Sequence, residues 1–341
     1  MPRFPRDPKA VTGRQREGAA MFAFVDVLTR FAQEYGDTAV SALAARAGAP
    51  LRIAVSGRAG VGRTTLTRAL TGAGRRASLA GDGRVGHPDV VVVVVAEAVK
   101  PEDVSSVAAW RGAAVPVLVV RNKADLAGPI PPGPLRRLLA GTPVEPAVAL
   151  LADVRLDTGD LSALRTLIEH PADLRSPDAF LDGAHPLPRE ARLRLLRTLD
   201  RRGIAYAVRA LRDGADPRDL PALLRELSGI DRVLGRVDAL TAPVRYRRVR
   251  SAVTELQGRA AGDERVAEFL AGNDVVLAVM TAAVDVVQAA GLEVDRGDDA
   301  AAHLRRAVRW RGYSRGPVGP LHRACGADIC RGSLRLFERR R

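Results

Sequence analysis

The segment Gly57–Thr64 has the residue types needed to hold a phosphate group. It reads Gly-Arg-Ala-Gly-Val-Gly-Arg-Thr. Gly57, Gly60 and Gly62 let the backbone turn tightly enough for successive N–H groups to point at one anion. Thr64 adds a hydroxyl that is a candidate ligand for Mg²⁺. We therefore expect this segment to bind the phosphates of a nucleotide.

The segment matches the pattern GxxxxGK[ST] at every position except the lysine, which is Arg63 here. A guanidinium is wider than an ammonium and planar, so Arg63 can neutralise phosphate charge only in a different geometry. The apolar run at 51–56 predicts a buried strand before the loop. Residues 64–71, which include Thr65, predict a helix whose N-terminus adds partial positive charge at the same place.

A second candidate site follows another apolar strand, predicted at 115–121. Asn122-Lys123-Ala-Asp125 comes directly after it. The carboxylate of Asp125 can accept two hydrogen bonds, one from the ring N–H and one from the exocyclic amine of guanine. Adenine does not offer this arrangement, so the motif predicts a preference for guanine.

Together these two motifs make residues 40–170 resemble the translation-factor-like class of P-loop GTPases, which includes Era-type and dynamin-type proteins. The resemblance implies an α/β fold with a mostly parallel sheet and flanking helices, with the valine run after Asp89 as its central strand. It implies GTP or GDP as cofactor, with Mg²⁺ as a candidate. The residues it assigns to the nucleotide are Gly57, Gly60, Gly62, Arg63, Thr64, Thr65, Asn122, Lys123 and Asp125, with Thr64 on the metal.

The chain also departs from this family. Only 25 positions separate Thr64 from Asp89, where a working member needs two switch segments and two further strands. Residues 77–80 leave room for one short residual strand, and Asp82–Gly86 has one residue too many for the switch pattern Asp-x-x-Gly. The Ser-Ala loop expected near 151–158, between a final strand at 144–151 and a final helix at 161–170, is degenerate. Because phosphoryl transfer depends on the metal, the loop lysine and a water-orienting residue, we expect slow or absent hydrolysis and no catalytic residue is assigned.

Three functions remain open. The first is a guanine-nucleotide-binding protein whose nucleotide state positions a basic helical domain against a partner. The second is an interaction module with a relic loop that binds no nucleotide. The third is a GTPase activated by dimerisation, which would borrow its missing groups from a second copy.

The composition indicates anionic partners. The net charge is +14, and only Lys9, Lys100 and Lys123 are lysines among 53 basic residues. Arginines concentrate at 189–202, 245–250 and 305–341, so an anionic membrane surface or an acidic protein is a candidate partner. A solvated surface in an arginine-rich proteome explains the same pattern. We find no specific nucleic-acid motif, and aromatic residues make up only 4% of the chain.

The breaks in the sequence predict the domain organisation. They give a disordered tail at 1–17, N-terminal helices at 18–48, the GTPase-like domain at 49–170, a proline-rich linker at 171–188 and an all-α C-terminal domain at 189–341. The N-terminal helices are expected to pack against the C-terminal part. Cys325 and Cys330 are expected to be free thiols rather than a disulfide framework or a zinc site. With no signal peptide or membrane span in the pattern, we expect a cytoplasmic protein, with peripheral membrane association left open.

Overall fold

The computed structural model describes residues 19–81, 87–125 and 137–340. The chain divides into two compact units, Leu51–Val237 and the combination of Met1–Pro50 with Asp238–Arg341. We call them the α/β unit and the helical unit. The tail predicted at 1–17 and the pattern at 82–86 lie outside the described residues.

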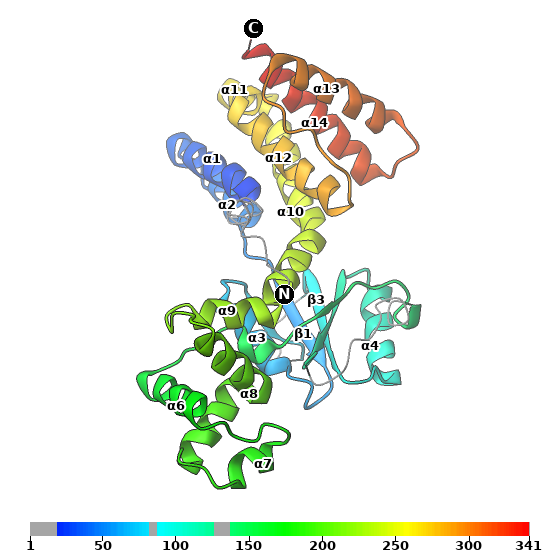
Figure 1. Cartoon of the computed structure of the whole chain (residues 1–341). Helices are drawn as coiled ribbons and strands as arrows, with labels where there is room; N and C mark the ends of the chain where they lie inside the picture. Colours follow the sequence, from blue (N-terminus) through cyan, green and yellow to red (C-terminus); the bar gives the residue numbers. More distant parts are fainter. Residues whose placement is uncertain (1–18, 82–86, 126–136, 341) are drawn as a thin grey trace. The chain divides into compact units, whose positions relative to one another are not determined.

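The α/β unit is built on a five-stranded, all-parallel sheet in the order β2-β1-β3-β4-β5 (Figure 1). The first six residues of β3 are all buried valines, as expected for a parallel strand that is covered on both faces. This confirms the predicted α/β class with a parallel sheet. The strands are β1 (Ile53–Gly57), β2 (Ala77–Leu79), β3 (Val90–Ala96), β4 (Val117–Asn122) and β5 (Val144–Pro146).

The strand order reverses at β1. The chain passes from β1 to β2 on one side of the sheet and then returns to β3 on the other side of β1. In open α/β sheets, ligands bind at the carboxyl ends of the strands where the order reverses in this way. The glycine segment leaves β1 at this point and leads into α3 (Arg63–Gly72). Helix α4 (Pro101–Gly112) joins β3 to β4, and α6 (Thr158–Glu169) follows β5.

Two expectations about the sheet have different outcomes. The residual strand predicted at 77–80 is present as β2. The final strand predicted at 144–151 is wrong in length, because β5 ends at Pro146 and a 3-10 turn, η2 (Ala149–Leu151), follows. The N–H of Ala147 still donates to the carbonyl of Arg121 on β4 at 2.9 Å, but the N–H of Val148 donates away from the sheet, to the carbonyl of Ser228. The N–H of Ala149 instead donates to the side chain of Asn122 at 2.9 Å, which turns the chain away from the sheet.

The structure places the division between the units later than the predicted linker at 171–188. Helices α7 (Pro177–Asp182), α8 (Arg189–Arg212) and α9 (Leu220–Ser228) all belong to the α/β unit. Phe180 and Leu195 share a buried core with Leu164 of α6. Because proline is well suited to the first turn of a helix, Pro177 starts α7 instead of breaking structure.

The helical unit combines the two ends of the described chain. Its elements are α1 (Ala19–Tyr35), α2 (Thr38–Ala47), most of α10 (Ile230–Ala260), α11 (Glu264–Ala271), α12 (Asn273–Ala289), α13 (Ala300–Arg315) and α14 (Pro320–Glu338) (Figure 1). Phe24 and Leu28 are buried in one core with Val279 and Val286. Phe31 stacks on Phe269 with ring centroids 4.0 Å apart. The prediction that the N-terminal helices pack against the C-terminal part is therefore confirmed.

Helix α14 lies in the stretch that the sequence predicts to be all-α. It carries both cysteines, which are free, and Cys325 is buried. Burial raises the pKa of the Cys325 thiol to about 12. Among the described residues, no single helix is long and apolar enough for a membrane span. Only α11 and α12 taken together, across a bend of 52°, reach that length and composition.

Candidate functional site

The glycine segment forms an open turn between β1 and α3. Gly60 and Gly62 have φ angles of 81° and 93°, which L side chains rarely adopt. Within the described chain, the N–H groups from Ala59 to Gly62 donate to no protein acceptor. Gly62 occupies the N-cap position of α3 and supplies no side-chain cap. Unpaired N–H groups in a turn of this shape, next to an uncapped helix N-terminus, are the donors that an anion requires.

Asn122 joins this turn to the segment after β5. Its Nδ2 donates to the carbonyl of Val61 at 2.9 Å, and its Oδ1 accepts from the N–H of Ala149 at 2.9 Å. The side chain is buried. A Cβ at Gly62 would lie 2.2 Å from the Asn122 Nδ2, so this hydrogen bond needs glycine at that position. The structure thus brings the two predicted motifs together through one amide side chain.

Gly57 is also fixed by close packing. A Cβ there would lie 2.4 Å from the carbonyl oxygen of Val94 on the adjacent strand. Its φ angle of 139° lies in the range that favours glycine. Gly57 therefore lets the turn leave the sheet beside β3 without a clash.

Sequence reasoning missed an anchor of this turn, the buried carboxylate of Asp103. Its Oδ1 accepts from Nε of Arg58 at 3.0 Å, and its Oδ2 accepts from the N–H of Lys100 at 3.0 Å. The hydrogen bond to Asp103 raises the pKa of Arg58. The sequence signal was the run Lys100-Pro-Glu-Asp103, because an acidic residue at the third position of a helix commonly caps its start.

The other residues predicted to bind the phosphates lie in different surroundings. They are Arg63, Thr64 and Thr65. The Arg63 side chain is partly exposed and makes no hydrogen bond or ion pair with any described residue. Thr64 is exposed on the first turn of α3. The described chain holds no group of three His, Cys, Asp or Glu side chains placed to bind a metal, so no acidic cluster accompanies the Thr64 hydroxyl predicted for Mg²⁺. Thr65 instead lines a separate hollow of about 170 Å³ with Arg68 and Leu150.

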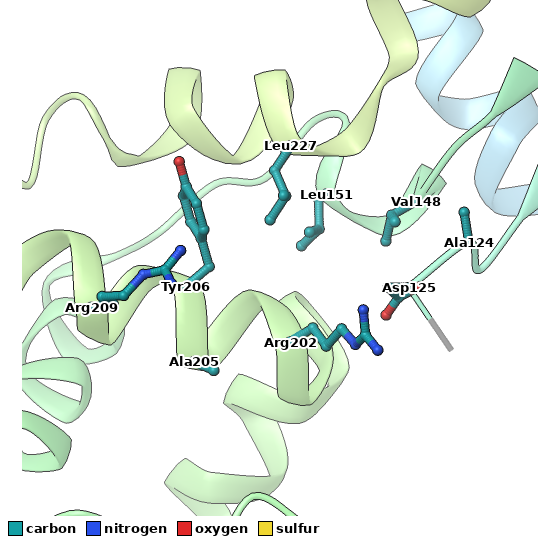
Figure 2. Close-up of a pocket in the computed structure, with 9 residues that line it drawn as sticks. All are labelled: Ala124, Asp125, Val148, Leu151, Arg202, Ala205, Tyr206, Arg209 and Leu227. Carbon is teal, nitrogen blue, oxygen red and sulfur yellow. The ribbon is translucent and has the colours of Figure 1, made fainter. Parts of the chain in front are cut away.

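Asp125 lies beside a larger hollow of about 610 Å³. Its Oδ2 is buried and has no hydrogen-bond partner among the described residues. An unpaired buried carboxylate oxygen is costly, and a ligand that donates hydrogen bonds would satisfy it. Lys123 adopts a φ angle of 54° in the turn that leads to Asp125. Figure 2 shows the side chains around this hollow, which are Ala124, Asp125, Val148, Leu151, Arg202, Ala205, Tyr206, Arg209 and Leu227.

The walls of this hollow come from four regions of the α/β unit. The Asp125 turn forms one wall, Val148 and Leu151 form the apolar floor, α8 forms the wall opposite Asp125, and α9 contributes Leu227 (Figure 2). The residues of the glycine segment do not line it. The structure therefore places Asp125 at a separate hollow that is connected to the phosphate turn through Asn122.

The spacing of residues in the sequence of α8 does not predict that this helix lines the hollow. Its Gly203 packs on Leu151 so closely that a Cβ would lie 2.8 Å from the Leu151 Cδ2. Asp200 has a non-helical φ of 56°, which bends the helix three residues before this contact. A glycine often ends a helix, but the chain is helical at Gly203, which serves close packing instead.

Several arginines of the predicted basic stretches are structural. Arg192 is buried and donates to the carbonyls of Phe180 and Gly183. Arg245 pairs with Asp238 at 2.8 Å. These side chains are not free to meet an external anion, so the charge count overstates the accessible basic surface.

Comparisons with models of protein families, with curated proteins and with solved structures found no match. The geometry of this site is therefore the basis for assigning a function.

Proposed function

We propose that the α/β unit binds a guanine nucleotide, GDP or GTP, and hydrolyses GTP slowly or not at all. The observation that carries the proposal is the pair of hydrogen bonds made by Asn122, to Val61 and to Ala149. They connect a turn suited to phosphate with a hollow that presents the unpaired carboxylate oxygen of Asp125. Phosphate at one end and a guanine edge at the other is the ligand that these two features favour together.

The assignment of roles follows from the donors and acceptors. The free N–H groups near Gly60 and Gly62 would hold the phosphates, with the charge of Arg63 close to the same helix N-terminus. Asp125 would accept from the guanine N–H groups. Mg²⁺ would contact Thr64 and would otherwise depend on the phosphates and water, as this ion often does.

Weak hydrolysis is expected for two reasons, which are Arg63 in place of lysine and the short segment between Thr64 and β3. The guanidinium fork fits the outer phosphates differently from an ammonium. Phosphoryl transfer is accelerated almost entirely by positioning and by charge stabilisation. A turn that binds the phosphates in a changed geometry would therefore still bind the nucleotide, but the rate of GTP hydrolysis would be low.

Nucleotide state would reach the helical unit through α10. The carbonyl of Ser228, which precedes this helix, accepts from the N–H of Val148 at 2.8 Å. Arg236 on α10 pairs with Glu145 of β5 at 3.2 Å. The helix then continues past Asp238 into the helical unit. We propose that occupancy of the site adjusts this helix and so controls contact with an acidic protein or an anionic membrane surface.

Calorimetric titration with GTP, GDP and ATP, each with and without Mg²⁺, tests the central proposal. We expect GTP and GDP to bind and ATP to bind at least tenfold more weakly, which corresponds to about 1.4 kcal/mol. Equal affinity for ATP and GTP would contradict guanine recognition. Hydrolysis that rises steeply with protein concentration would favour the dimer-activated GTPase instead.

A further inference from the structure

The wall of the hollow opposite Asp125 carries a cation that the proposed function does not use. Arg202 lies on α8, and Figure 2 shows its guanidinium and the carboxylate of Asp125 pointing toward one another across the hollow. The structure records no hydrogen bond or ion pair between them within the described chain. Both charged groups therefore face the space that a ligand would enter.

The position of Arg202 is fixed by its neighbour in sequence. Gly203 sits against Leu151 without a side chain of its own, and Leu151 forms part of the floor of the hollow. Ile204, on the same turn, is buried in the core that holds Leu195 and Leu224. The backbone at Arg202 is thus tied to the floor, while its side chain stays exposed at the rim.

The backbone around the floor has few donors left for a ligand. The N–H groups of Val148, Ala149, Leu151 and Ala152 all donate to protein acceptors. The remaining N–H in this run belongs to Leu150, which lines the smaller hollow with Thr65. A ligand acceptor that meets this floor therefore has few backbone donors and needs a donor from a side chain of the opposite wall.

The edge of guanine presents two donors, N1–H and the exocyclic amine, beside one acceptor, the keto oxygen O6. A carboxylate complements the two donors and a guanidinium complements the acceptor. We propose that Arg202 donates a hydrogen bond to the keto oxygen of the base while Asp125 accepts from the two N–H groups. This inference rests on the proposed guanine binding and makes α8, outside the nucleotide motifs, a determinant of base specificity.

The test compares GDP with 6-thio-GDP, in which sulfur, a weaker acceptor, replaces O6 and both N–H groups stay. Calorimetry is run on the full chain and on the variants Arg202→Met, Arg202→Lys and Arg209→Met. Arg209 is the matched control, because it lines the same hollow from the same helix and its loss removes the same charge. Circular dichroism checks that each variant is folded.

We expect wild type to bind GDP roughly tenfold more tightly than 6-thio-GDP, the effect of about one hydrogen bond. Arg202→Met should weaken GDP binding roughly tenfold and leave the two ligands nearly equal, whereas Arg202→Lys should keep part of the preference. Arg209→Met should preserve the wild-type preference.

Three results would overturn the inference. If Arg202→Met binds GDP as wild type does, Arg202 does not contact the base, while the proposed function survives. If Arg202→Met and Arg209→Met weaken both ligands equally, the arginines act only through general charge attraction. If wild type binds no guanine nucleotide, the proposed function fails, and this inference fails with it.

Discussion

At the scale of single residues, the site depends on its glycines as much as on the residues that carry functional side chains. Gly62 must lack a Cβ for Asn122 to reach the carbonyl of Val61. The sequence motif identifies Gly62 and Asn122 separately, but the hydrogen bond that links them is visible only in three dimensions. The same holds for Arg58 and Asp103, which lie 45 residues apart.

Replacing Gly62 by alanine tests this dependence. We expect a loss of about 2–3 kcal/mol in the free energy of unfolding, because a strained φ and a lost buried hydrogen bond add together. Nucleotide binding should disappear as well. Gly74→Ala is the control, since Gly74 has a similar φ of 76° and open space around it. It should cost only about 1 kcal/mol and leave binding intact. Urea unfolding and GDP titration measure both effects, and equal behaviour of the two variants would contradict the role of Asn122.

Replacing Asp125 by asparagine should change the base that is preferred. An amide offers one acceptor and one donor in place of two acceptors, so it suits the N1–H and the C2 keto oxygen of xanthine better than the N1–H and exocyclic amine of guanine. We expect GDP affinity to fall roughly 10- to 100-fold, because charge-assisted hydrogen bonds from guanine to the carboxylate are lost. XDP affinity should rise. Asp178→Asn, at an exposed position on α7, is the charge-matched control. If D125N keeps the wild-type ranking of GDP over XDP, Asp125 does not read the base.

At the scale of elements, periodicity and turn residues identified most helices and strands, and tertiary contacts set their ends. The valine run and the strand before Asn122 were predictable, because buried parallel strands are continuous apolar segments. The end of β5 was not, since the N–H of Ala149 pairs with a side chain distant in sequence. Helix α8 joined the site through Gly203, a residue that propensity alone interprets as a break.

Helix α14 packs against α12 through a glycine, which gives a second test at this scale. A Cβ at Gly332 would lie 2.4 Å from the sulfur and 2.6 Å from the Cβ of Met280. We expect Gly332→Ala to destabilise the helical unit by about 2 kcal/mol through overpacking. Gly312→Ala on α13, with nothing within 4 Å of its added Cβ, should gain about 0.5–1 kcal/mol from helix propensity. Thermal unfolding of both variants measures the difference, and equal midpoints would contradict close α12–α14 packing.

The buried His303 on α13 makes the stability of the helical unit depend on pH. Burial is the main cause that lowers its pKa, and the neighbouring Arg306 lowers it further, against the opposite effect of Asp298 and Asp299. Its Nδ1 lies 2.6 Å from a nitrogen of Arg306. Because the folded pKa is below the unfolded one, the unfolded state binds more protons as the pH falls through the range near and below 6.5.

Stability should therefore be full above that range and should fall as the pH is lowered through it. Denaturant unfolding at pH 7.5 and 5.5 measures this decline, with His303→Gln as the comparison, since glutamine does not titrate. We expect the variant to lose less stability than wild type between these pH values. An identical decline in both proteins would assign the effect to other groups.

At the scale of the whole molecule, the sequence suggested a nucleotide domain followed by a helical domain, and the structure shows a different division. The helical unit is made of the first 50 and the last 104 residues, with the α/β unit inserted between them. The boundary falls inside α10, so no break in the sequence marks it. Composition and turn residues locate flexible linkers, but a helix that runs through a boundary leaves no such signal.

Two units with separate cores should unfold in two calorimetric steps. A ligand stabilises only the unit that binds it, by about 2.7 kcal/mol when its concentration is 100 times its Kd. We expect GDP to raise the midpoint of one step and Gly332→Ala to lower the midpoint of the other. Scanning calorimetry of wild type and G332A, with and without GDP, shows whether the two shifts separate. A single step that both changes move would contradict independent units.

The insertion of the α/β unit also constrains the order of folding during synthesis. Helices α1 and α2 leave the ribosome before the α/β unit, yet Phe24 and Leu28 share a core with residues of α12, which is made only after the α/β unit and α10. The α/β unit, contiguous from Leu51 to Val237, can complete its core long before that. A nascent chain halted before α12 would thus carry a folded α/β unit together with two helices whose apolar faces are exposed. Chaperones should retain such truncated chains.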